Sequence, residues 1–169
     1  VSSAAIIIVL VYGTWRLEQF DYVKTPGPVV ASIQSNVPLH VKQSWNSSDD
    51  IFVEMLTQTQ TAAEFKPDLI VWPETMVQAM LNPEILAILD SNSQANIYDR
   101  KLRSLAHTGP NLLVGAYGGA VKIEDGQYKL DKNYNSAFLY RPDGSQFEKS
   151  YNKIHLVPFG EVVPFKESW

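Results

Sequence analysis

Three ionisable side chains lie in apolar surroundings near predicted strand ends, and each is of a type that could take part in catalysis. Glu74 directly follows the apolar run DLIVW, and Lys153 and Glu161 lie in the segment YNKIHLVPFGEVVPF. A partly desolvated carboxylate is a better base near neutral pH than one in water. A lysine ammonium among apolar neighbours could stabilise a developing oxyanion. These residue types therefore make Glu74 a candidate general base and Lys153 a candidate oxyanion stabiliser.

Each of the three also has a structural interpretation. Glu74 can begin the next helix and complement its dipole. Lys153 can be an edge-strand lysine that discourages association between strands. Glu161 follows Gly160, which permits an unusual backbone turn, so it can pair with Lys153 or lie in a surface loop. The residue types alone leave both interpretations open.

Other candidates carry weaker signals. His155 lies two residues after Lys153, so both would face the same side of a strand, although a lone histidine is more often structural. Trp45, in a polar loop, could line a substrate site or cover the core. No two histidines have metal-ligand spacing, and the chain has no cysteine, which excludes a disulfide scaffold and a zinc–thiolate site. We expect neither a metal nor a cofactor.

Composition limits the class of protein. The chain has 169 residues, enough for one domain with a substantial core, and 45% of them are hydrophobic, which argues against disorder. The formal net charge is −4, and the sequence contains no run rich in lysine or arginine. A nucleic-acid partner is therefore not expected.

The elements that must position these residues follow from hydrophobic periodicity and turn signals. A helix begins at Ser47 or Ser48, where Asp49 and Asp50 favour the positive end of its dipole, and ends before Pro67. We predict this helix to about residue 65, further helices near 75–90 and 95–107, strands at 29–34, 68–72 and 111–119, and hairpins at 122–130 and 135–153. This order predicts an α/β layered domain with a mixed sheet.

The opening run VSSAAIIIVLVYGTW carries no charge before Arg16. It is shorter than the roughly 20 apolar residues that a membrane span needs. It could be the end of a transmembrane helix, with Tyr12 and Trp15 at the water interface, or a buried element or signal-peptide core. Residues 17–28 are polar and rich in proline and glycine near their end, which is typical of a linker.

Five segments together resemble one family, the nitrilase (carbon–nitrogen hydrolase) superfamily. They are VVASIQSNVP, Lys42–Trp45, LIVWPET, YNSAFLY and YNKIHLVPFGEVVP, and HLVPFGEVVP is closest to the apolipoprotein N-acyltransferase branch. The resemblance runs from about Pro28 to the end of the chain. It implies a nitrilase-like α-β-β-α sandwich at 29–169, incomplete at its C-terminus, after the end of a transmembrane helix (1–16) and a linker (17–28).

The resemblance also implies roles. Glu74 would be the general base and Lys153 the lysine of a Glu-Lys-Cys triad, with Glu161 supporting the lysine and Trp45 a weaker substrate-binding candidate. The triad cysteine is absent, so we expect a fragment that is inactive alone. The implied reaction moves an acyl chain from a phospholipid to the N-terminal amine of a diacylated apolipoprotein, at the periplasmic side of the bacterial inner membrane. A soluble amidase or nitrilase and a non-catalytic nitrilase-like domain are the alternatives.

Overall fold

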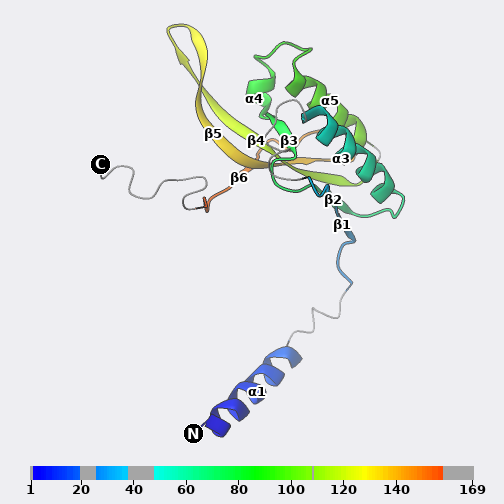
Figure 1. The fold of residues 1–169 in the computed structure, drawn as a ribbon, viewed down its shortest axis with the longest axis vertical. Helices are drawn as coiled ribbons and strands as arrows, with labels where there is room; N and C mark the ends of the chain where they lie inside the picture. Colours follow the sequence, from blue (N-terminus) through cyan, green and yellow to red (C-terminus); the bar gives the residue numbers. More distant parts are fainter. Residues whose placement is uncertain (1, 20–25, 38–47, 108, 158–169) are drawn as a thin grey trace.

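The computed structural model describes residues 2–19, 26–37, 48–107 and 109–157, and Figure 1 shows how their helices and strands are arranged. A mixed sheet forms the centre of the fold. Its strands lie in the order β1 (Val30–Ser32), β2 (Leu69–Val71), β4 (Asn111–Glu124), β5 (Gln127–Tyr140) and β6 (Tyr151–Asn152), and β3 (Val77–Met80) pairs with β4. The strands β1, β2, β3 and β4 pair in parallel, whereas β4, β5 and β6 pair antiparallel. The predicted mixed α/β sheet is confirmed.

Two long helices pack together on one face of this sheet (Figure 1). They are α3 (Ser48–Ala63) and α5 (Gln94–Ala106), and the short helix α4 (Pro83–Leu86) precedes α5. The ring of Phe52 on α3 stacks on the ring of Tyr98 on α5, with centroids 4.0 Å apart. This aromatic pair joins the two helices above the sheet and is part of the buried core.

Alternate residues of β4 face the two sides of the sheet, and only one side is fully covered. Leu112, Val114 and Ala116 are buried in the core beneath the helices. Between them lies Leu113, which is only partly buried and aligns with Val71 on β2 and Leu139 on β5. The second face of the sheet is therefore also apolar, as in sheets that are packed on both sides.

One predicted element is wrong. The helix expected at 75–90 is instead the strand β3 followed by the four-residue helix α4. Thr75 has a positive φ of 55°, which breaks any helix at its first turn, and Pro83 begins α4. Pairing of β3 with β4 outweighs the local helical pattern of this segment.

The other predicted strands and helices are confirmed, with small differences at their ends. The hairpin at 122–130 turns at Asp125 and Gly126, both at positive φ, which is the backbone that a two-residue turn requires. The predicted hairpin at 135–153 begins within β5, whose residues Ser136 and Ala137 pair with β6. The two hairpins therefore share a single long strand.

The N-terminal run forms α1 (Ser2–Glu18), and its apolar side chains are exposed. Those of residues 6 to 11 are each exposed by 60–68%. Among the described residues, no helix has both the length and the apolar character needed to cross a membrane.

Candidate active site

Glu74 lies in the turn between β2 and β3, at the carboxyl end of a parallel strand, where ligand clefts of open α/β sheets lie. The residues beside it fix this turn. The buried indole of Trp72 donates a hydrogen bond of 2.7 Å to the hydroxyl of Thr59 on α3, and its backbone N–H donates to the carbonyl of Leu113. Glu74 is thus held by its neighbours while 55% of its own side chain stays exposed.

A glycine in β4 lets this turn approach the sheet closely. A Cβ atom placed on Gly115 would lie 2.8 Å from the Cα of Glu74 and still nearer to the carbonyl oxygen of Pro73. No side chain fits in that space without moving the backbone. Gly115 therefore sets how close the Glu74 turn lies to β4.

Lys153 comes directly after β6 and reaches the same place from the other half of the sheet. Its backbone N–H donates to the carbonyl of Asn135 on β5, at 2.8 Å. Its ammonium Nζ lies 3.0 Å from Oε1 of Glu74, and its side chain is only 26% exposed. Two residues that are 79 positions apart in the sequence are thereby brought into one ion pair.

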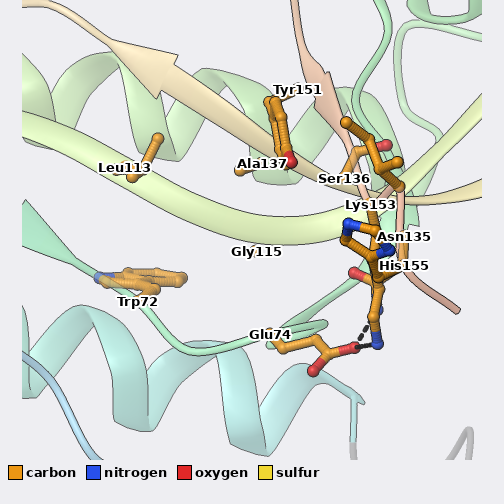
Figure 2. A pocket seen from close by; sticks show the side chains of 11 residues that line it. Trp72, Glu74, Leu113, Gly115, Asn135, Ser136, Ala137, Tyr151, Lys153 and His155 are labelled. Atoms are coloured by element: carbon orange, nitrogen blue, oxygen red, sulfur yellow. Dashed lines mark hydrogen bonds and ion pairs between the residues drawn. The ribbon is translucent and has the colours of Figure 1, made fainter. Parts of the chain in front are cut away.

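Asn135 completes the cluster, and the sequence analysis did not single it out. Its side-chain amide donates to the same Glu74 oxygen, Oε1, that Lys153 contacts. Figure 2 shows the three side chains converging, with dashed lines from Lys153 and Asn135 to Glu74. The signal that could have found Asn135 is its place before Ser136 in the YNSAFLY segment. A carboxylate with two such donors is fixed in orientation.

An open cavity of about 380 Å³ lies beside this cluster (Figure 2). The surface of the cavity is mostly apolar, and its polar residues include the Glu74–Lys153 pair and Asn135. The lining residues are Trp72, Glu74, Leu113, Gly115, Asn135, Ser136, Ala137, Tyr151, Lys153, Ile154 and His155. An apolar cavity with a few convergent polar groups is the usual form of a small-molecule site.

Of the remaining predicted site residues, the structure describes only some. Trp45 and Glu161 lie outside the described residues. His155 lines the cavity, but the chain after Asn152 is not a strand, so the strand-based argument for its side does not apply. The alternative in which Glu74 begins a helix is wrong, because β3 follows it. Among the described residues, no cluster of acidic or histidine side chains is arranged to hold a metal ion.

The fold and the sequence agree with one family. The family model for carbon–nitrogen hydrolase matches residues 29–168. The chain belongs to the carbon–nitrogen hydrolase family. Among curated proteins, it is similar to the apolipoprotein N-acyltransferases of Rhizobium meliloti (28% identical, over 100% of this chain and 30% of that protein) and Photobacterium profundum (33% identical, over 90% and 27%). The chain thus spans less than a third of the length of these relatives.

Solved structures agree on the fold. The chain superposes on the amidase of Nesterenkonia sp. AN1 with a TM-score of 0.53 and 19% sequence identity, over 80% of this chain and 47% of that one. A mutant of that amidase, described as a member of the nitrilase superfamily, gives a TM-score of 0.52 at 19% identity. The described sheet and helices are therefore a nitrilase-like α/β fold.

Proposed function

We propose that this chain is the N-terminal part of the catalytic domain of an apolipoprotein N-acyltransferase. The whole enzyme would move an acyl chain from a phospholipid to the N-terminal amine of a diacylated lipoprotein. The observation that carries the proposal is the 3.0 Å contact between the Lys153 ammonium and the Glu74 carboxylate beside an apolar cavity. Similarity to proteins of that name gives the substrate class.

In this proposal Glu74 is the general base. A thiol attacks an acyl ester only as a thiolate, so a base must first take its proton. Glu74 takes the proton, and the sulphur adds to the ester carbonyl carbon. The ester C–O bond then breaks, and the departing lysophospholipid oxygen receives the proton from Glu74. The product of this half-reaction is a thioester on the enzyme.

Lys153 stabilises the negative oxygen of each tetrahedral intermediate. In the second half-reaction the lipoprotein amine adds to the thioester carbonyl and loses a proton to Glu74. The C–S bond breaks, and the thiolate recovers that proton. Asn135 keeps the carboxylate oriented through its amide, so that Glu74 and Lys153 meet the reacting atoms in a fixed geometry.

The sulphur nucleophile belongs to no residue of this chain, which contains no cysteine. We assign it to a segment outside these 169 residues, and we expect the 169-residue chain to be inactive alone. The apolar second face of the sheet, with Val71, Leu113 and Leu139 only partly buried, supports an α-β-β-α sandwich in which a further sheet covers this face. Residues 29–169 would supply the first half of that domain.

The apolar helix α1 supports the membrane part of the proposal. Its exposed apolar side chains, together with Tyr12 and Trp15, fit the end of a transmembrane helix covering residues 1–16, followed by a linker at 17–28. The catalytic domain would then lie on the periplasmic side of the bacterial inner membrane, within reach of its phospholipid donor. Glu161 would support Lys153, and Trp45 would contact substrate.

The test uses the longer protein that contains this chain. Acyl transfer from a phospholipid with a labelled acyl chain to a diacylated lipopeptide is measured for Glu74→Gln, Lys153→Met and the exposed control Glu64→Gln. Loss of a general base lowers the rate by about 10²–10⁴-fold. We expect losses of that order at Glu74 and Lys153 and an unchanged rate at Glu64. Full activity of Glu74→Gln, or release of the labelled acyl group only to water, would contradict the proposal.

A further inference from the structure

The far ends of β4 and β5 form a two-stranded ribbon that extends beyond the helices (Figure 1). We call residues 121–130 the distal hairpin. Its cross-strand pairs place apolar side chains on one face and charged side chains on the other. Val121 pairs with Leu130 and Ile123 pairs with Tyr128, and these four side chains share one face. Between them, Lys122 pairs with Lys129 on the other face.

The apolar face of the distal hairpin is open to solvent. The exposed fractions are 69% for Ile123, 59% for Tyr128 and 52% for Leu130. The apolar side chains of the sheet beneath the helices are, in contrast, almost fully buried. A row of adjacent apolar side chains on an extended arm marks a surface for an interaction, whereas single exposed apolar residues do not.

The opposite face is polar and already paired. The ammonium of Lys129 lies 2.8 Å from a carboxylate oxygen of Glu124, and that of Lys122 lies 3.9 Å from Glu124 and 3.8 Å from Asp131. These side chains remain about half exposed, so this face is suited to water. The distal hairpin is thus an amphipathic ribbon, with an apolar side and an ion-paired side.

We propose that the apolar face of the distal hairpin lies in the lipid–water interface of a membrane. The face is too small for a stable protein partner, because such interfaces bury about 800 Å² on each side and this one offers two cross-strand pairs. A lipid surface needs no shape complementarity and takes up an amphipathic element in proportion to its apolar area. Tyr128 is a residue type enriched at that depth, and the ion-paired face with Lys122 and Lys129 would remain toward water.

The turn of the hairpin indicates how the ribbon lies. Asp125 is at the tip, so an end-on insertion would carry a carboxylate into the hydrocarbon. Lying flat, with Ile123 and Tyr128 toward the acyl chains and Lys122 toward water, avoids this cost.

This inference rests on the proposed function, since it concerns the same lipid donor. The strand that carries the hairpin also carries Asn135, and about 17 Å of extended strand separates Asn135 from Leu130. A hairpin held at the membrane surface would keep the Glu74–Lys153 pair at a fixed, short distance from the phospholipids. The hairpin would then position the site for its substrate without touching it.

Because the chain has no cysteine, single cysteines can be introduced without background labelling. Ile123→Cys and Tyr128→Cys report the apolar face, and their neighbours Lys122→Cys and Lys129→Cys are the matched controls on the other face. Each variant carries an environment-sensitive fluorophore in vesicles of phosphatidylethanolamine and phosphatidylglycerol. Quenching by spin-labelled lipid is measured against quenching by aqueous iodide. Binding through α1 alone brings both faces near the vesicle, so only the difference between faces is decisive.

For an interfacial ribbon we expect lipid quenching at positions 123 and 128 to exceed that at 122 and 129 by about threefold or more. Equal quenching on both faces overturns the proposal. Shielding of positions 123 and 128 from iodide before vesicles are added also overturns it, because a protein surface then covers the face. Repeating the measurement with Glu74→Gln separates the two proposals, since this change should abolish transfer in the longer protein and leave the quenching pattern unchanged.

Discussion

Replacing Gly115 by alanine tests whether the Glu74 turn is positioned by its close approach to β4. The new Cβ would lie 2.8 Å from the Cα of Glu74, whereas ordinary contacts begin at 3.4 Å, so the turn must move by at least about 0.6 Å. Gly115 does not have a positive φ, so alanine is allowed by the backbone and only the contact is changed. The perturbation therefore displaces the turn that carries Pro73 and Glu74 from the sheet, without straining the φ angle of residue 115.

The size of the effect follows from this displacement. Overpacking of a well-packed site costs about 1–3 kcal/mol, and for a chain of this size each kcal/mol lowers the melting temperature by about 2–4 °C. A misplacement of 1 Å at reacting atoms can cost about 10²-fold in rate, so we expect a loss between about tenfold and 100-fold in the longer protein. Gly27→Ala is the matched control, because no atom lies within 4 Å of its new Cβ.

The assays are thermal unfolding by circular dichroism for the 169-residue chain and acyl transfer for the longer protein. A Gly115→Ala protein that melts with the wild type and retains full transfer would show that the turn does not depend on this contact. A Gly115→Ala protein with a lowered melting temperature but full transfer would show that the displacement does not affect the position of the reacting groups. Either result refutes the positioning argument.

Three further changes test other contacts. Asn135→Leu removes the amide that orients the carboxylate, and we expect kcat to fall about tenfold with little change in KM. Trp72→Phe removes the buried hydrogen bond to α3, and we expect the free energy of unfolding to fall by about 1–3 kcal/mol in urea titrations. The hydrogen bond from Tyr98 holds the pKa of Asp49 below its usual value, so this contribution to stability is present above about pH 4 and is lost as the pH falls further. We therefore expect the melting temperature of Asp49→Asn to fall less than that of the wild type as the pH is lowered below about 4. An equal fall in both proteins would contradict the role of this hydrogen bond.

Local signals were sufficient for most of the fold. The run LIV before Pro73 and the Asp125-Gly126 turn specify a buried strand and a tight hairpin by their own chemistry. The segment at 75–90 was assigned wrongly because its strand pairing depends on β4, which comes more than thirty residues later. A positive φ at Thr75, a β-branched residue, has no sequence signal that would have predicted it.

The candidate site depended on more than local pattern. Spacing alone does not bring Glu74 and Lys153 together across 79 positions, and the prediction that they meet came from the family resemblance. Asn135 was missed although it lies in the YNSAFLY segment that carries the family resemblance, because the residue type alone does not indicate which side chain an asparagine binds. The catalytic roles of these residues stay predictions until they are measured.

The register of β4 and β5 is irregular between Ala120 and Val121, so that Asp131 is left out of the pairing. The two-residue turn sets the register of the pairs in the distal hairpin, and the rest of the sheet sets the register of the pairs between Ala120 and the site. Lengthening or shortening the distal hairpin by one residue on each strand would therefore leave Asn135 in its place. The length and composition of the distal hairpin are therefore independent of the geometry at Asn135, at the base of the same strand.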